Sequence, residues 1–278
     1  MKYKLIKLLF NKIFKVPYRI SSAIEYYYFQ IVFFINGAIK KIEKQQNKNF
    51  SEIGLDRSLG LKKLSDLTKL YPFIDNSMKS EHQVIFCSLS EIKFFKPKKI
   101  LEIGTFDGIN AFLLSKLFPK SEIITIDLKS EDNEFTDFYG RNSDNKLNNF
   151  VKKRNAILEN CNNVQFYEKN SLCLIDEDEN YDIIWIDGAH GYPILPIDIS
   201  NSIRLISKGG YIFCDDIYTS NRIKSDNMYK SNAGFETIKV LKKAKIIEFK
   251  LFFKRINYVD NSAPKNKKFI AAIKNITN

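Results

Sequence analysis

The sequence predicts an α/β fold built on a doubly wound, mostly parallel sheet. From residue 98 onward, short apolar runs typical of buried strands alternate with segments of helical periodicity. A turn between Gly104 and Gly108 follows the first run, and Asp127 ends the second. In an open α/β sheet, ligands bind in the crevice beyond the carboxyl ends of the strands, where we expect these residues to lie.

The residues before the sheet are helical in pattern and strongly basic. Residues 2–16 fit a basic amphipathic helix, and 20–39 is apolar and aromatic but interrupted by polar side chains. These interruptions argue against a membrane span, which needs about 20 predominantly apolar residues. Residues 40–49 are polar, and we interpret them as a linker. We therefore predict a helical extension and linker over 1–50.

The remaining chain, 51–278, is predicted to be one domain with a helical cap at 52–95 and an α/β core at 98–278. Two apolar runs near its end flank a polar loop and fit an antiparallel pair. We also expect Gly209 and Gly210 to end a helix. The predicted strands are 99–104, 122–127, 164–168, 182–187, 209–215, 246–253 and 268–274, and the predicted helices are 108–118, 145–160, 195–207 and 234–245.

Composition and charge exclude several classes of protein. The four cysteines show no C-x-x-C spacing and there are only two histidines, which argues against a secreted disulfide scaffold or a zinc site and fits a cytoplasmic protein. The net charge is +12, but residues 1–50 hold ten Lys/Arg against two Asp/Glu, whereas 101–200 holds nine against 18. Nucleic-acid enzymes usually spread positive charge around the site itself, so we expect no nucleic-acid partner.

The basic N-terminal residues 1–45 have two interpretations. They could contact a membrane peripherally, at its inner face, with lysines on anionic headgroups and apolar side chains in the acyl boundary. Alternatively, these helices pack on their own domain or on a sister subunit, which would make the protein a homo-oligomer.

The glycine turn carries information about the ligand. Gly104 and Gly108 let backbone N–H groups approach a ligand, and Asp127 lies where a carboxylate accepts hydrogen bonds from ribose hydroxyls. An adenosine-containing cofactor is therefore expected. Phe106 would crowd a pyrophosphate, and the negative charges of Glu102 and Asp107 suit a cationic ligand instead.

This segment resembles motif I of class I S-adenosylmethionine-dependent methyltransferases, whose usual form is (L/V)(L/D)E-x-G-x-x-x-G. The resemblance implies a Rossmann-like, seven-stranded methyltransferase sheet whose last strand pair is antiparallel. It also implies S-adenosylmethionine as cofactor, with Asp127 on its ribose and with Glu102 and the turn facing its methionine end. The turn consists of Gly104, Thr105, Phe106, Asp107 and Gly108.

Two further apolar runs end in acidic residues, Asp187 after the fourth strand and Asp215 with Asp216 after the fifth. Adjacent strands lie about 4.8 Å apart, so we expect the three carboxylates in one small volume. Such carboxylates repel unless a cation lies between them, and oxygen ligands suit Mg²⁺, or else Ca²⁺ or Mn²⁺. Alternatively, Asp187 and Asp215 only cap helices or bind loop amides.

The surrounding segments resemble the D-G-x-H-x-Y and G-G-x-(I/L)-x-x-(D/H)-D patterns of a bacterial small-molecule O-methyltransferase family. This family is related to macrocin-type, rhamnosyl and catechol-type enzymes, and the resemblance covers about residues 80–275. It implies a metal held by Asp187, Asp215 and Asp216. His190 stands three residues after Asp187, where catechol-type enzymes place a lysine base. We predict that Asp187 and His190 are catalytic, His190 either as the base or by orienting its loop.

Two other turns complete the predicted cofactor site. Related enzymes use a turn like Ser80–Gln83 to meet the methionine carboxylate, which makes Glu81 a candidate for cofactor binding; a plain helix cap is the alternative. Asn170 and Ser171 resemble the loop on the adenine side.

These resemblances imply a metal-assisted O-methyltransferase acting on a hydroxyl of a small molecule or sugar, with the loop 217–233 covering the acceptor. RNA or protein methylation is an alternative, although neither an Asn-Pro-Pro-Tyr-type motif nor a Pro-Cys pair supports it. A non-catalytic, membrane-associated binding protein on a methyltransferase fold is a third interpretation, which the intact acidic positions oppose.

Overall fold

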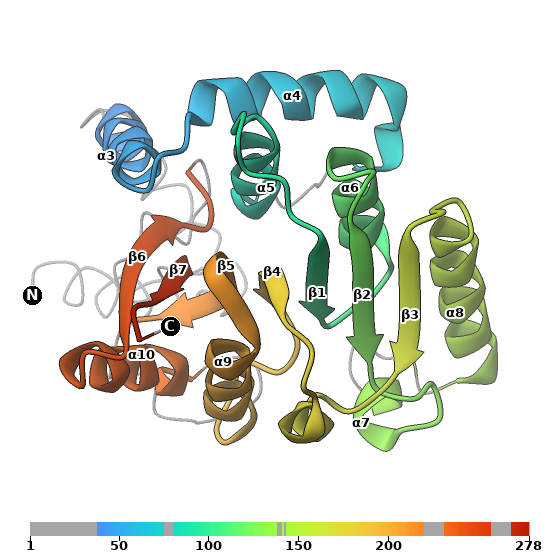
Figure 1. Ribbon diagram of the computed structural model, residues 1–278. Helices are drawn as coiled ribbons and strands as arrows, with labels where there is room; N and C mark the ends of the chain where they lie inside the picture. The colour runs from blue at the N-terminus through green and yellow to red at the C-terminus, as the bar shows by residue number, and fades with distance from the viewer. Residues whose placement is uncertain are drawn as a thin grey trace, which may run out of the picture.

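A computed structural model describes residues 38–74, 80–137, 141, 143–219, 231–256 and 268–277. It shows a seven-stranded sheet in the order β3-β2-β1-β4-β5-β7-β6 (Figure 1). The first five strands pair in parallel, and β7 runs antiparallel between β5 and β6, which confirms the predicted sheet. The strands are β1 (Lys99–Ile103), β2 (Glu122–Asp127), β3 (Val164–Glu168), β4 (Tyr181–Ile186), β5 (Ile206–Tyr218), β6 (Ile247–Phe253) and β7 (Lys268–Asn275).

Helices cover both faces of the sheet, as a doubly wound fold requires (Figure 1). The predicted amphipathic helix at 2–16, most of the apolar segment at 20–39 and most of the loop at 217–233 lie outside the described residues. The described helices are α3 (Ala38–Glu52), α4 (Arg57–Leu70), η1 (Pro72–Ile74), α5 (His82–Ser90), α6 (Ile109–Leu117), α7 (Asn133–Asp137), α8 (Asp144–Leu158), η3 (Ser171–Asp176), α9 (Ile194–Leu205) and α10 (Ala233–Lys243).

The core has two layers because side chains alternate between the faces of each strand. On one face, Ile100, Trp185 and Phe213 pack with Phe86 of α5 and Phe112 of α6. The predicted helical cap therefore supplies part of the main core through α5. The opposite layer joins Leu101, Ile103, Ile184, Ile186 and Ile212 of the strands to Leu195, Ile199 and Ile238 of α9 and α10.

The predicted linker at 40–49 is wrong, because these residues form most of α3. Their polar side chains have partners on the edge strand β6. The Gln46 amide donates to the carbonyl of Phe253 (3.0 Å) and accepts from its N–H (2.9 Å), and Asn49 Nδ2 donates to the carbonyl of Leu251 (3.0 Å). Backbone groups on an open sheet edge need partners, and here buried amide side chains provide them.

The expected role of Gly209 and Gly210 as a helix end is also wrong. Helix α9 ends at Leu205, and β5 begins at the next residue, so both glycines lie within the strand. A Cβ on Gly210 would stand 2.8 Å from the carbonyl oxygen of Asp182 on β4. Glycine at this position is explained by the close approach of two strands.

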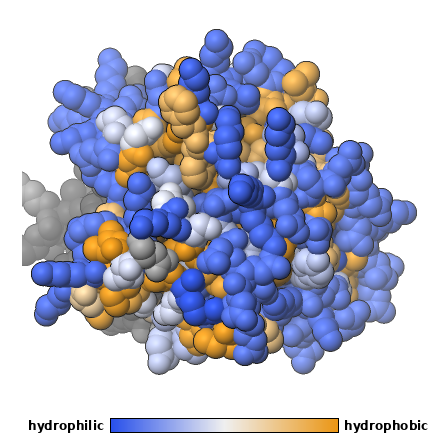
Figure 2. All heavy atoms as spheres, in the orientation of Figure 1, coloured by the Kyte–Doolittle hydropathy of each residue, from blue (hydrophilic) through white to orange (hydrophobic). Residues whose placement is uncertain are grey.

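The surface in the view of Figure 2 is mostly hydrophilic, with separate apolar patches. Several large apolar side chains are exposed, among them Leu70 and Phe94. Within the described ranges, no helix has both the length and the apolar character that crossing a membrane requires.

Candidate active site

A cavity of about 430 Å³ opens at the carboxyl ends of β1, β2, β4 and β5. Sites for small molecules and cofactors occupy about 300–1,000 Å³, so this cavity is large enough for one. Its lining includes predicted site residues from both motifs: Gly104, Phe106, Asp127, Asn170, Ser171, Asp187, His190, Asp215 and Asp216. The structure thus brings together segments more than 100 residues apart in the sequence.

The glycine turn after β1 packs closely against the ends of β2 and β4, the two strands beside β1. The N–H of Gly104 donates to the carbonyl of Ile126 (2.8 Å), and its φ is +98°. A Cβ at this position would lie 2.5 Å from the carbonyl oxygen of Asp187. Gly108 (φ +78°) is the N-cap of α6. Only glycine fits the first position, because the backbone conformation and the space both exclude a side chain.

Asp127 is held at the end of β2 by backbone amides of two loops. Its Oδ2 accepts from the N–H of Phe106 (2.8 Å) and its Oδ1 from the N–H of Leu128 (2.9 Å). Burial raises the pKa of Asp127, whereas these hydrogen bonds and the charges of Arg154 and Arg141 oppose the rise. The carboxylate oxygens retain acceptor capacity toward the cavity, so the site fits a ribose diol.

Glu102, which precedes the turn, and Thr105 and Asp107, which belong to it, are not among the residues that line the cavity. Glu102 accepts from Thr125 Oγ1 (2.5 Å) and Asn110 Nδ2 (2.8 Å). Burial raises the pKa of Glu102 to about 7. The hydroxyl groups of Thr105 and Thr125 are 2.6 Å apart, and Asp107 accepts from the N–H of Ile109 at the start of α6 (3.1 Å). These side-chain contacts support the turn, and a contact of these residues with the cofactor stays a prediction.

Glu81 does not line the cavity, contrary to the prediction of a direct cofactor contact. Its carboxylate accepts from Arg57 Nε (2.7 Å) and Nη2 (2.8 Å), and from Gln46 Nε2 (3.2 Å). Such a bidentate pair fixes both side chains. Glu81 therefore joins α3 and α4 to the start of α5, and its neighbours Ser80 and His82 line the cavity instead.

His82 adds a second imidazole to the cavity. Its Nδ1 is 2.8 Å from Ser80 Oγ, and its ring stacks on Trp185 with centroids 5.2 Å apart. Burial lowers the pKa of His82 to about 4, so it is neutral at physiological pH. In the sequence, the one indication that His82 lines the cavity is its position at the start of a helix.

Asn170 and Ser171, which are predicted on the adenine side of the cofactor, line the cavity. Asn170 begins η3 by accepting from the N–H of Leu172 (3.0 Å). Sequence reasoning missed two other residues of the lining, Phe135 and Arg141, whose guanidinium lies 3.8 Å from the ring centre of Phe135. They form no motif in the sequence: Phe135 belongs to the short helix α7, and Arg141 lies between α7 and α8.

The three predicted carboxylates converge at the other end of the cavity, but two lysines join them. Lys254 Nζ contacts Asp215 Oδ2 (2.5 Å) and also pairs with Asp216. Lys268 Nζ contacts the second oxygen of Asp216 (2.5 Å). Asp187 lies beside these residues in the cavity lining. The sequence offered no sign of either lysine, since both lie about 40–50 positions after the acids that they pair with.

These residues do not fit a divalent metal ion. The cation between the acids is the ammonium group of Lys254, and it and Lys268 already pair with three of the carboxylate oxygens of Asp215 and Asp216; the fourth, Asp215 Oδ1, is buried without a hydrogen-bond partner among the described residues. Across the described ranges, no group of three or more His, Cys, Asp or Glu side chains is arranged to hold a metal ion. The three carboxylates line one cavity, as predicted, but the cation beside Asp215 and Asp216 is a lysine ammonium group in place of the predicted metal ion.

His190 lies against the acid cluster. Its Nε2 is 3.6 Å from Asp187 Oδ1 and 4.0 Å from Asp216 Oδ2, and its Nδ1 is buried without a hydrogen-bond partner among the described residues. Burial lowers the pKa of His190 and raises the pKa of Asp187 well above its ordinary value. For Asp216 the effect of burial is outweighed by Lys254, His190 and Lys268, which lower its pKa.

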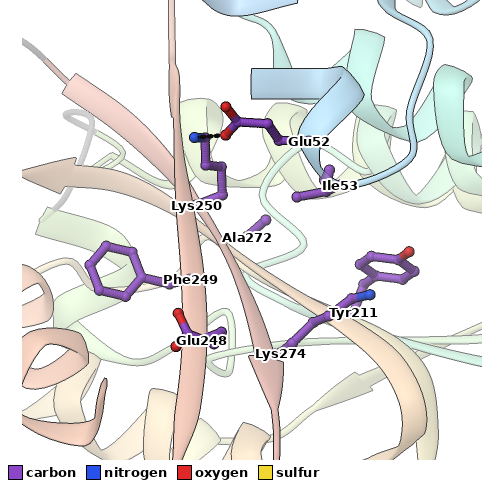
Figure 3. A pocket seen from close by; sticks show the side chains of 8 residues that line it. All are labelled: Glu52, Ile53, Tyr211, Glu248, Phe249, Lys250, Ala272 and Lys274. Carbon is purple, nitrogen blue, oxygen red and sulfur yellow. Dashed lines mark hydrogen bonds and ion pairs between the residues drawn. The ribbon is translucent and has the colours of Figure 1, made fainter. Parts of the chain in front are cut away.

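A second cavity, of about 330 Å³, lies between the end of α3, β6, β7 and the start of β5 (Figure 3). Lys250 pairs there with Glu52, and Tyr211 forms part of the wall. None of the predicted site residues lines this cavity, so we place the active site at the carboxyl ends of the strands.

Comparisons with known proteins support this location. Residues 101–217 match the family model of a methyltransferase domain. A cofactor-bound protein from MTB superposes with a TM-score of 0.50 at 14% identity, over 78% of this chain and 91% of that one. The O-methyltransferase TomG of Streptomyces achromogenes, in complex with SAM, has a TM-score of 0.49 at 14% identity, over 77% of this chain and 89% of that one. No curated protein sequence matches the chain.

The family match runs from β1 to β5 and includes the glycine turn, Asp127, Asp187 and Asp215, but not Lys254 or Lys268. The similarity to the MTB protein concerns the fold, which is the fold that motif I implies. Residues 101–217 are therefore similar to a methyltransferase domain, and the sheet has the seven strands and the antiparallel last pair that motif I implies.

Proposed function

We propose that the protein transfers a methyl group from S-adenosylmethionine to a hydroxyl oxygen of a small molecule or sugar. One observation carries this proposal: Asp127, suited to a ribose, and His190, suited to proton transfer, line the same cavity. S-adenosylmethionine, when bound, supplies an electrophilic methyl group on a sulfonium. The remaining steps fall to residues of this chain.

Asp127 and the glycine turn would hold the donor. Asp127 is already oriented by two backbone amides, so binding a ribose requires little rearrangement. The turn at Gly104 allows the backbone to approach the ligand closely. Positioning alone contributes much to methyl transfer, because the acceptor oxygen must lie in line with the methyl carbon at near-attack distance.

His190 would accept the proton of the acceptor hydroxyl. A hydroxyl is a poor nucleophile until its proton leaves, and a neutral imidazole is a suitable base near neutral pH. Burial lowers the pKa of His190, which favours the neutral imidazole. Its Nε2 faces the carboxylates of Asp187 and Asp216, at 3.6 Å and 4.0 Å.

The metal assistance expected from the sequence has no part in this proposal, because lysine side chains already neutralise the acids. A sugar or similar hydroxyl compound suits this end of the cavity, whose lining is polar and includes Asp187, His190 and the paired side chains of Asp216 and Lys254.

The experiment is a transfer assay with labelled S-adenosylmethionine and a panel of hydroxyl compounds, with an amine analogue of each as the matched control. We expect label in base-stable products of hydroxyl compounds and a parallel release of S-adenosylhomocysteine. Transfer only to amines, to protein or to RNA would contradict the proposal.

A further inference from the structure

The acid cluster at the ends of β4 and β5 contains its own cation. We propose that the ammonium group of Lys254 occupies the place of a divalent ion, so that this active site works without a metal. The inference extends the proposed function, because it names the group that organises the acceptor end of the same cavity.

The first support is contact. Lys254 Nζ bridges the carboxylates of Asp215 and Asp216, the two acids that neighbour each other at the end of β5. All three side chains are buried, and Lys254 also lines the cavity. The sequence pattern predicts a metal ion between these acids, and in the structure the ammonium group of Lys254 lies between them instead.

The second support is that the lysine is anchored. The N–H of Lys254 donates to the carbonyl of Lys268 (3.1 Å), and the carbonyl of Lys254 accepts from the N–H of Glu81 (2.8 Å). Glu81 is in turn fixed by its bidentate pair with Arg57. These bonds fix the backbone from which the side chain of Lys254 reaches the acids.

The third support is charge. Asp215 and Asp216 face the ammonium groups of Lys254 and Lys268, and Arg255 also lines this end of the cavity. A divalent ion would add two positive charges to carboxylates that are already neutralised, in a buried region where like charges repel strongly. It would have to displace an anchored lysine to bind.

Asp216 also has an unusual backbone conformation. Asp216 has a φ of +51°, which is uncommon for a residue with a side chain. Its Oδ1 pairs with Lys254 and its Oδ2 pairs with Lys268. The lysines thus fix Asp216 beside His190, whose Nε2 is 4.0 Å away, and Lys254 acts as a positioning residue.

The test measures metal binding without turnover. Mn²⁺ is titrated into the full-length wild-type protein, into Lys254→Met and into Lys268→Met as the matched control, and Mn²⁺ uptake is followed by calorimetry and by thermal shift. We expect no uptake by wild type, a new Mn²⁺-dependent rise in melting temperature for Lys254→Met, and little change for Lys268→Met, which keeps the bridging ammonium.

A wild-type protein that binds one Mn²⁺ in this cluster would overturn the proposal. A folded Lys254→Met that takes up no Mn²⁺ would also overturn it, because the lysine would then be an ordinary ion pair. If Lys254→Met does not fold, Lys254→Gln replaces it in the same titration, because it also removes the ammonium group but keeps a polar side chain beside the acids. S-adenosylmethionine binding, measured alongside, tests the proposed function separately, since it does not depend on Mn²⁺.

Discussion

The two ends of the active-site cavity differ in how they are built. The cofactor end is made by β1, the glycine turn and β2, a continuous segment in which Asp127 is oriented by backbone amides. The acceptor end joins Asp187 and His190 to Asp215 and Asp216, and then to lysines at the far end of the chain. The first end depends on local backbone geometry, whereas the second depends on charges brought together by tertiary folding.

This difference predicts that mutations at one end leave the other end functional. The largest effect is expected for His190→Ala, which removes the proposed base. The turnover rate should fall by about 10²–10⁴-fold, while the dissociation constant for S-adenosylmethionine stays nearly unchanged. Steady-state assays and calorimetry measure the two quantities. An equal loss in both would mean that His190 belongs to the cofactor end.

The pH profile sharpens this prediction. His190 must be neutral to accept a proton, and burial lowers its pKa from 6.5. Activity of the wild type should therefore rise with pH, with the midpoint of the rise below about pH 6.5. A rise centred well above neutral pH would point to a different base.

The next effect is expected at the cofactor end. Asp127→Ala removes a carboxylate that we place on the ribose, and hydrogen bonds to charged groups contribute about 1.5–3 kcal/mol. The affinity for S-adenosylmethionine should fall by about 10–100-fold. Glu168→Ala is the control, because Glu168 pairs in register with Asp127 on β3 but does not line the cavity. Similar losses in both variants would remove Asp127 from the binding site.

The smallest effect concerns stability. Burial raises the pKa of Glu102 from 4.5 to about 7, so between these pH values the folded protein keeps a proton that the unfolded chain has lost. The free energy of unfolding should therefore decrease as the pH rises through this range, by at most about 3 kcal/mol from this group.

Glu102→Gln cannot lose this proton, so its stability should decrease less between pH 5 and pH 8. One kcal/mol corresponds to about 2–4 °C in melting temperature for a protein of this size. Thermal melts of both proteins across this range provide the measurement. Parallel curves would show that Glu102 titrates normally in the folded state.

The fold and the cofactor end could be predicted because their signals are local. Apolar runs along the sequence predict the strands. The turn after β1 requires glycine at position 104, and that glycine can be recognised in the sequence. Asp127 follows at the next strand end, so one segment of the sequence contains both the turn and the carboxylate.

The remaining features depend on contacts that periodicity does not report. The polar face of α3 resembles a linker, but Gln46 and Asn49 hydrogen-bond to the edge strand β6 more than 200 residues away. Lys254 likewise carries no motif, and only the pairing of β7 between β5 and β6 brings it to Asp215. Local patterns placed the acids, and tertiary structure supplied their counter-ions.

The central claim is that the cavity beyond β1 and β2 binds S-adenosylmethionine. The most direct measurement is calorimetric titration of the wild-type protein with S-adenosylmethionine, with S-adenosylhomocysteine and with NAD. We predict one-to-one binding of the first two ligands and none of NAD. Binding of NAD in the absence of any heat from S-adenosylmethionine would contradict this account of the site.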